Sequence, residues 1–253
     1  MLKTRVIPVL LLKGNDLVKT TKFKKPLYIG DPINAIKIFN DKEVDELIFL
    51  DIEASKKSRE PNYKLIESFA TECFMPICYG GGITTIEQMK KIFKLGVEKI
   101  SINLSLLDNL ELLRESSSIF GSQSIVVSID IKKNFFGNYS IYNHKKKRIN
   151  KQELVRYVQL LEENGAGEIM INNVDLDGTL EGYDLKLIKN IKDLITIPLI
   201  TCGGAKDLND FKEAKDLAVS GVAAGSFFVF YGKHRAVLIT YPQYKELEKT
   251  FGE

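Results

Sequence analysis

The sequence has no tryptophan, two histidines (His144 and His234) and three cysteines in 253 residues. With so few histidines, neither a metal site of clustered histidines nor a histidine-based catalytic triad is expected. We therefore expect chemistry that depends on carboxylates, lysine and backbone groups, with no metal and no cofactor. The cysteines (Cys73, Cys78 and Cys202) lack CxxC spacing and lie in apolar stretches, which indicates reduced core thiols of a cytoplasmic protein.

Long apolar runs and strong net charge are also missing. No stretch approaches the roughly 20 apolar residues of a membrane-spanning helix, and the N-terminal MLKTRVIP lacks the apolar core of a signal peptide. A net charge of +3 is too small to imply nucleic acid as a partner. With 44% hydrophobic and 27% charged residues, we expect a soluble globular chain that forms one domain over residues 1–253.

Strand-like and helix-like segments alternate along the whole chain. The expected strands cover 6–12, 47–52, 76–79, 98–103, 124–130, 168–172, 197–201 and 221–225, and the expected helices cover 32–42, 61–73, 84–95, 107–120, 151–164, 184–194, 207–218 and 242–250. Nearly continuous apolar strands indicate a parallel sheet that is buried on both faces. Eight such units favour a closed (β/α)₈ barrel over an open doubly wound sheet, with the reactive residues at the C-terminal ends of the strands.

The second half of the chain repeats the first, which predicts a barrel built from two half-barrels. PICYGGGI at 76–83 and PLITCGGA at 198–205 each combine an apolar strand, a glycine turn and a following helix. Such turns let backbone N–H groups approach an anion beside a helix N-terminus, although a plain tight turn has the same pattern. We predict two phosphate sites, formed by Gly81, Gly82 and Asn103 and by Gly203, Gly204, Gly225 and Ser226.

Other polar residues follow the predicted strands. Asp130 ends the fifth strand, where it could act as a general acid or base, or could merely cap a helix. The repeat predicts a matching carboxylate at position 11, but that residue is Leu11. Asp177, after the sixth strand, could bind substrate hydroxyls or cap a helix. Lys19, in a loop expected over 13–30, could reach over the barrel mouth as a cation or acid, or could be solvated.

Four charged residues lie at the opposite, N-terminal ends of strands: Arg5, Glu46, Lys99 and Glu168. Two positive and two negative side chains around a barrel bottom can form a ring of salt bridges, while the simpler interpretation is a solvated charged rim. The alternating sign favours the ring.

Together these residues resemble the HisF family, the cyclase subunits of imidazole glycerol phosphate synthase. The resemblance covers the whole chain and is carried by RVIP at 5–8, Lys19, GDP at 30–32, FLDI at 49–52, GGGI at 80–83, KISIN at 99–103, FGSQ at 120–123, Asp130, GAGEI at 165–169, DLDGT at 175–179, GYDL at 182–185 and CGGA at 202–205.

The resemblance implies a barrel that works with a HisH-like glutaminase docked on its N-terminal face, from which ammonia passes through the barrel. It assigns the ammonia gate to Arg5, Glu46, Lys99 and Glu168, and one catalytic aspartate to Asp130. The implied phosphate contacts are Gly82, Asn103, Gly203, Gly204 and Ser226.

The substrate end departs from the family pattern. The second catalytic aspartate of the family corresponds to Leu11, and leucine cannot transfer a proton. Asn172 and Asn173 replace a threonine and a serine, and we expect Asn172 to face the substrate. The departures, with LLLK at 10–13, NAIKIFN at 34–40 and MPICYGGGI at 75–83, resemble a HisF-like branch that is associated with surface-polysaccharide genes.

Proteins of that branch supply ammonia to an amidotransferase-like enzyme that converts an N-acetyl group on a sugar to an acetamidino group. We therefore predict an ammonia-channelling subunit with a glutaminase partner, a possible third enzyme and a phosphorylated small-molecule or sugar substrate. The first alternative is the cyclase of histidine biosynthesis, which both phosphate sites favour and Leu11 opposes. The second is a non-catalytic activator of a glutaminase.

Overall fold

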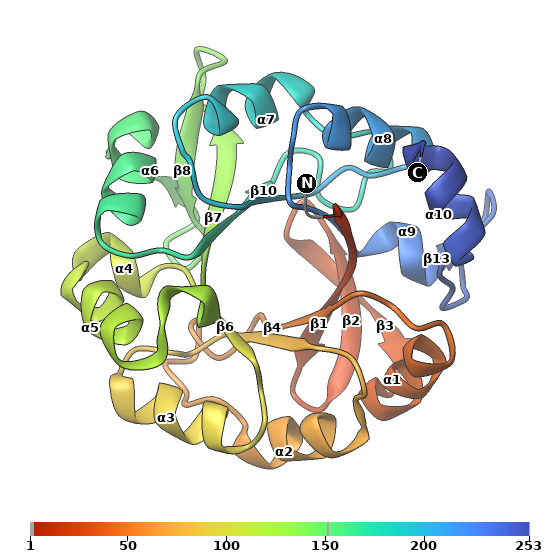
Figure 1. Ribbon diagram of the computed structural model, residues 1–253, viewed down its shortest axis with the longest axis horizontal. Helices are drawn as coiled ribbons and strands as arrows, with labels where there is room; N and C mark the ends of the chain where they lie inside the picture. The colour runs from red at the N-terminus through yellow and green to blue at the C-terminus, as the bar shows by residue number, and fades with distance from the viewer. Residues whose placement is uncertain (1–2, 151, 253) are drawn as a thin grey trace.

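The computed structural model describes residues 3–150 and 152–252, and its core is a closed barrel of eight parallel strands (Figure 1). The barrel strands are β1 (Arg5–Lys13), β4 (Leu47–Asp51), β5 (Ile77–Gly80), β6 (Lys99–Ile102), β7 (Ile125–Lys133), β10 (Glu168–Asn173), β11 (Leu199–Cys202) and β12 (Gly221–Ala224). Pairing of β6 with β7 and of β12 with β1 joins the two half-barrels, and pairing of β7 with β10 completes the second half. Closure confirms the predicted (β/α)₈ barrel and is incompatible with the open sheet.

Helices surround the barrel in the order of the chain (Figure 1). They are α1 (Pro32–Asp41), α2 (Tyr63–Glu72), α3 (Ile86–Lys94), α4 (Ser105–Asp108), α5 (Glu111–Phe120), α6 (Leu154–Glu163), α7 (Leu185–Lys192), α8 (Leu208–Asp216), α9 (Ser226–Val229) and α10 (Tyr244–Phe251). Several begin at a side-chain cap: Asp31 accepts from Asn34 N, and Thr85 forms a capping box with Gln88. No helix within the described residues is long and apolar enough to cross a membrane.

Two apolar layers hold the barrel together. The larger lies between the strands and the helices, where the rings of Phe49 and Phe69 stack with centroids 4.3 Å apart. The smaller fills the barrel interior and includes Ile7, Ile48 and Met170. Burial on both faces explains why the strand sequences are nearly continuously apolar.

Side chains of a strand alternate between its two faces, so residues two apart share the barrel interior. On β1 this inward series runs from Arg5 to Leu11, and on β10 it runs from Glu168 to Asn172. The same spacing therefore places charged residues at the bottom of the barrel and the candidate substrate residues at its mouth.

The chain from 13 to 30 forms a hairpin, and the prediction of a loop there was wrong. Strands β2 (Asp16–Thr21) and β3 (Lys24–Gly30) pair with each other, and β2 extends β1 in antiparallel fashion. Leu17 and Val18 are buried at the barrel mouth, which gives this lysine-rich segment an apolar anchor. The segment after β7 also forms a hairpin, from β8 (Tyr139–Asn143) and β9 (Arg148–Ile149), and β8 pairs with β7.

Smaller differences concern helix ends. The single helix expected over 107–120 is split into α4 and α5, and the short pair β13 (Phe230–Tyr231) and β14 (Ala236–Val237) was not predicted. Lys151, at which the helix over 151–164 was expected to begin, lies outside the described residues.

Candidate functional site

A cavity of about 510 Å³ opens at the C-terminal ends of the barrel strands. Its lining includes Leu11, Lys19, Asp130 and His144, together with both glycine turns. The fold thus gathers residues from both halves of the chain into one pocket, at the end of the barrel where the sequence placed it.

Asp130 is a hydrogen-bonded carboxylate of this cavity. Its side chain is buried at the end of β7 and accepts hydrogen bonds from Asn103 Nδ2 (3.0 Å) and Asn172 Nδ2 (3.5 Å). His144 Nδ1 lies 2.8 Å from Asp130 Oδ2. Asn103 and Asn172, which we expected to contact phosphate or substrate, therefore also orient the candidate catalytic carboxylate.

His144 was missed by the sequence analysis, which expected no histidine chemistry. It lies in the turn between β8 and β9, and the hairpin folds back over the mouth to bring it to Asp130. The available signal was its place in a long segment that leaves the strand ending in Asp130, but periodicity does not reveal where a turn residue points.

The opposite wall of the cavity is apolar. Leu11 packs in the interior cluster with Val9, Val18 and Leu50. The strand register pairs Leu11 with Leu50 on one side of the barrel and Asp130 with Asn172 on the other. Positions 11 and 130 are therefore equivalent in space, and only one half of the barrel carries a carboxylate there.

Lys19 reaches the mouth from β2 and is paired rather than free. Its Nζ lies 2.7 Å from Asp177 Oδ1, and both side chains are buried. Asp177 also accepts from Thr20 Oγ1 at 3.1 Å and from the backbone of Phe23 at 3.4 Å. The pair fixes the β2–β3 hairpin to the loop after β10, so catalysis by Lys19 and substrate binding by Asp177 stay predictions.

The two glycine turns have backbone conformations that require glycine. In the first, φ is +119° at Gly81 and +75° at Gly82, and in the second it is +92° at Gly203 and +117° at Gly204. A Cβ on Gly204 would lie 2.0 Å from the Gly182 carbonyl oxygen. Both turns line the cavity, as the phosphate prediction requires, although the Gly82 N–H already donates to Ser55 Oγ at 3.3 Å.

The remaining residues of the second predicted phosphate site, Gly225 and Ser226, lie at the start of α9. Ser226 is buried, and its hydroxyl lies 3.4 Å from a guanidinium nitrogen of Arg235. Gly225 leaves room for a neighbouring side chain, since a Cβ there would lie 2.9 Å from Cε of Lys19. This contact gives Gly225 a steric role beside its predicted role in anion binding.

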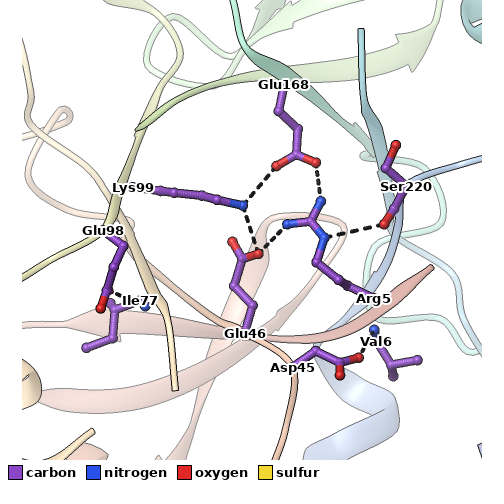
Figure 2. Close-up of polar contacts among 9 residues, drawn as sticks. All are labelled: Arg5, Val6, Asp45, Glu46, Ile77, Glu98, Lys99, Glu168 and Ser220. Carbon is purple, nitrogen blue, oxygen red and sulfur yellow. Dashed lines mark hydrogen bonds and ion pairs between the residues drawn. The ribbon is translucent and has the colours of Figure 1, made fainter. Parts of the chain in front are cut away.

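At the bottom of the barrel, Arg5, Glu46, Lys99 and Glu168 form a closed ring of ion pairs, hereafter the charged ring (Figure 2). Arg5 binds both glutamates, and Lys99 Nζ lies 3.0 Å from Glu46 and 3.3 Å from Glu168. Burial opposes the charge on Arg5, but attraction to Glu168 and Glu46 outweighs it and raises the pKa of the guanidinium. The ring therefore replaces the solvated rim that was the simpler interpretation.

Two further carboxylates stabilise the strand ends around the charged ring (Figure 2). Asp45 accepts from the backbone N–H of Val6 at 2.7 Å, and Glu98 accepts from that of Ile77 at 2.8 Å. Burial raises the pKa of Asp45, against the opposing effect of this hydrogen bond. These bonds satisfy amides that would otherwise lack a strand partner.

A protein-family model described as "Histidine biosynthesis protein" matches residues 5–235 of the chain. The chain is 55% identical to a Pseudomonas aeruginosa protein provisionally named imidazole glycerol phosphate synthase subunit hisF2, over 98% of this chain and 99% of that one. The chain belongs to the HisF family. A Leptospira borgpetersenii relative with a provisional HisF name is 47% identical over 99% and 100% of the two chains, and the Petrotoga mobilis imidazole glycerol phosphate synthase subunit HisF is 38% identical over 93% and 94%.

In this HisF-family chain, the side chains of the barrel interior between the charged ring and the mouth are apolar apart from thiols and hydroxyls. Burial raises the pKa of Cys78 well above its ordinary value and that of Cys202 to about 12, so both thiols are neutral at physiological pH. The Ser101 and Ser128 hydroxyls share a 2.6 Å hydrogen bond and also line the cavity. Within residues 3–150 and 152–252, no three His, Cys, Asp or Glu side chains are arranged to hold a metal ion.

Proposed function

We propose that this protein is an ammonia-channelling synthase subunit that works with a HisH-like glutaminase, in the formation of acetamidino sugars for bacterial surface polysaccharide. The observation that carries the proposal is the combination of an intact charged ring with an apolar residue, Leu11, at the mouth. The protein keeps the charged ring through which ammonia would enter, but it lacks one carboxylate of the cyclase. On this proposal, ammonia is still delivered to the mouth, and the reaction that consumes it has changed. The proposal places this work in the cytoplasm.

The charged ring supports a role as a gate for ammonia. It closes the N-terminal end of the interior, and the pairs must separate before a molecule can pass. Glu46 Oε1 is buried and has no hydrogen-bond partner among the described residues. An unpartnered buried acceptor is costly, and an entering ammonia molecule can satisfy it by donating an N–H.

Beyond the ring, the interior favours neutral ammonia over ammonium. Ile7, Ile48, Val126 and Met170 belong to the apolar cluster that fills this space. A charged ion entering such a region loses its hydration without compensation, whereas neutral ammonia loses much less. The proposed path ends at the cavity, where Asp130 can accept or return a proton as ammonia adds to an electrophilic carbon.

Sequence similarity also supports a branch distinct from the histidine enzyme. The chain is 55% identical to the P. aeruginosa protein provisionally named hisF2, but 38% identical to the Petrotoga mobilis HisF. The higher identity to the P. aeruginosa protein supports a branch that is separate from the Petrotoga mobilis HisF.

Complementation separates the two pathways. We expect the gene to restore acetamidino sugars to the surface polysaccharide of a bacterial strain that makes them and lacks its own HisF-like subunit of this branch, and to leave a histidine auxotroph that lacks its HisF unrescued. In parallel, mixing the purified protein with a HisH-like glutaminase is expected to give a complex and to change the rate of glutamine hydrolysis. If mixing gives no complex and no change in the rate of glutamine hydrolysis, the channelling proposal is overturned.

Histidine biosynthesis is the second candidate because both glycine turns keep the geometry expected of phosphate sites. It requires the protein to convert phosphoribulosyl formimino-AICAR phosphate and ammonium salt to imidazole glycerol phosphate and AICAR. Robust turnover with ammonium chloride alone would return the protein to that pathway.

The third candidate, a non-catalytic activator of the glutaminase, is separated by Asp130→Asn. An activator should tolerate this substitution with unchanged glutamine hydrolysis and unchanged cellular product. A chemical subunit should retain the stimulation of hydrolysis and lose the product.

A further inference from the structure

His144 combines three features of a proton-transferring residue. It lines the cavity, its side chain is 21% exposed, and its Nδ1 lies 2.8 Å from a buried carboxylate oxygen of Asp130. Its other ring nitrogen, Nε2, has no hydrogen-bond partner among the described residues. One nitrogen is therefore occupied by the protein and the other is left for a bound molecule.

The hydrogen bond determines where the proton lies on the ring. Asp130 Oδ2 also accepts from Asn103 Nδ2, so this oxygen is an acceptor for two donors. An ionised carboxylate can only accept, so beside ionised Asp130 the ring carries a proton on Nδ1 whether it is neutral or charged. In the neutral ring, the lone pair is on Nε2, which is the arrangement by which an aspartate orients a catalytic histidine as a base.

The turn that carries His144 is held in place from several sides. The ring packs edge-on against Phe23 of the β2–β3 turn, with centroids 6.4 Å apart. Asn143 caps the turn by accepting from the backbone N–H of Lys146 at 2.8 Å. Lys145 Nζ reaches across to Ser58 Oγ at 3.2 Å. Contacts with two other loops of the mouth therefore keep the imidazole near Asp130.

We infer that His144 is a catalytic residue of this pocket, and that Asp130 orients it through Nδ1 so that Nε2 transfers the proton. The position equivalent to Asp130 in the other half-barrel is Leu11, so the pocket has no carboxylate at that place. His144 supplies the proton-carrying group from a loop instead. This inference rests on the proposed function, since it assigns a role within the same site.

The step balances as follows for ammonia addition to an electrophilic carbon. The nitrogen lone pair forms the new C–N bond as the π bond from that carbon to its oxygen or nitrogen breaks and leaves its electron pair on that atom. The ammonia nitrogen then carries one proton too many. Nε2 takes that proton, which gives an imidazolium whose Nδ1–H remains on the Asp130 carboxylate. The imidazolium returns the proton to the leaving oxygen or nitrogen as its bond to carbon breaks, so the ring ends neutral and Asp130 stays ionised.

The chain offers a matched control, because His234 is its only other histidine and is exposed outside the cavity. In a His234→Gln variant, all histidine signals come from His144. Nitrogen-15 NMR of that variant, at a pH high enough to neutralise the ring, is expected to show the proton on Nδ1 and a bare Nε2. Asp130→Ala should release this preference, with folding checked by urea denaturation. A proton on Nε2 in the parent variant overturns the inference.

Activity is then compared between His144→Gln and His234→Gln. Both are tested for restoration of acetamidino sugars in the complemented strain and for turnover of phosphoribulosyl formimino-AICAR phosphate with ammonium chloride. If the wild type works in cells, His144→Gln should abolish the restored product at equal protein level. If the wild type works with the purified substrate, His144→Gln should lower the turnover number by about 10²-fold or more with little change in KM, because general acid–base groups contribute on that scale. His234→Gln should match the wild type.

Two outcomes separate the inference from the proposed function. If His144→Gln retains turnover within about threefold of the wild type, the catalytic role is overturned and the proposed function stands. If the wild type works in neither assay, the proposed function fails, and the NMR result still decides whether Asp130 holds His144 with Nε2 exposed to the cavity.

Discussion

The ends of β1 and β7 occupy equivalent places in the two half-barrels and differ in chemistry. Leu11 pairs with Leu50 in an apolar wall, whereas Asp130 pairs with Asn172 and accepts from Asn103. The glycine turns of the same two halves keep positive φ at both paired positions. The repeat has been retained where the backbone shape depends on it and lost where a single side chain carries the chemistry.

The two half-barrels also differ at the bottom of the barrel. Lys99 begins β6, and the matching position of the second half is Gly221 at the start of β12. A Cβ on Gly221 would lie 2.9 Å from Cδ1 of Ile7 and 3.2 Å from Cγ1 of Ile200, so glycine leaves space for these two interior side chains. At this position the first half supplies a cation of the charged ring, and the second half supplies space for the apolar interior.

Removing the carboxylate at the end of β7 should have the largest effect. Asp130→Leu makes the end of β7 resemble the end of β1, and we expect product formation to fall by about 10²–10⁴-fold because general acid–base chemistry is lost. The amount of product in the complemented strain and the initial rate with phosphoribulosyl formimino-AICAR phosphate and ammonium chloride give the measurement. Stimulation of the glutaminase should persist, since the charged ring lies at the other end. Loss of both activities would show that the two ends are not independent.

Breaking the charged ring should mainly reduce stability. Arg5→Ala leaves Glu46 and Glu168 buried with only Lys99 as a counter-charge, and the side chain of Arg5 is 25% exposed. Breaking a buried pair costs about 3–5 kcal/mol, and partial exposure reduces our expectation to about 2–4 kcal/mol in the free energy of unfolding. Urea denaturation measures this. Arg156→Ala, which removes a half-exposed pair with Glu163, should cost under about 0.5 kcal/mol.

Restoring a carboxylate at position 11 makes the end of β1 resemble the end of β7. Leu11→Asp should raise turnover of phosphoribulosyl formimino-AICAR phosphate with ammonium chloride by about 10-fold or more, since it supplies a second acid or base. It should also cost about 1–3 kcal/mol of stability, because the wall formed by Val9 and Leu50 offers the carboxylate no partner. Leu11→Asn is the matched control, similar in size but unable to transfer a proton. Equal turnover by both variants would contradict the expectation.

The smallest effect concerns pH and the buried thiol at the mouth. Burial raises the pKa of Cys202 from 9.0 to about 12. An unfolded thiol therefore ionises first, and the contribution of Cys202 to stability, complete below pH 9, falls as the pH rises toward 12. We expect this residue to account for about 1 kcal/mol of lost stability between pH 8 and pH 10. The loss measured by urea denaturation should be smaller by that amount in Cys202→Ala, and an equal loss would contradict the assignment.

Much of the architecture was accessible from sequence because it depends on local, repeated patterns. Apolar runs that alternate with amphipathic helices determined the eight strands, and the two glycine turns marked the strand ends at the mouth. The inward series on β1 and β10 placed Arg5 and Glu168 at one end and Leu11 and Asn172 at the other, as period-two alternation requires.

Contacts made by the mouth segments were decided only by the tertiary structure. Lys19 and Asp177 form a buried pair although 158 positions separate them, and the hairpin that carries Lys19 was predicted to be a loop. His144 reaches Asp130 because the β8–β9 turn folds back over the barrel. Neither contact follows from periodicity, since the direction of a turn is determined by what it packs against. The sequence by itself determined the barrel, the glycine turns and the missing carboxylate at position 11, and the tertiary structure decided which side chains meet across the mouth.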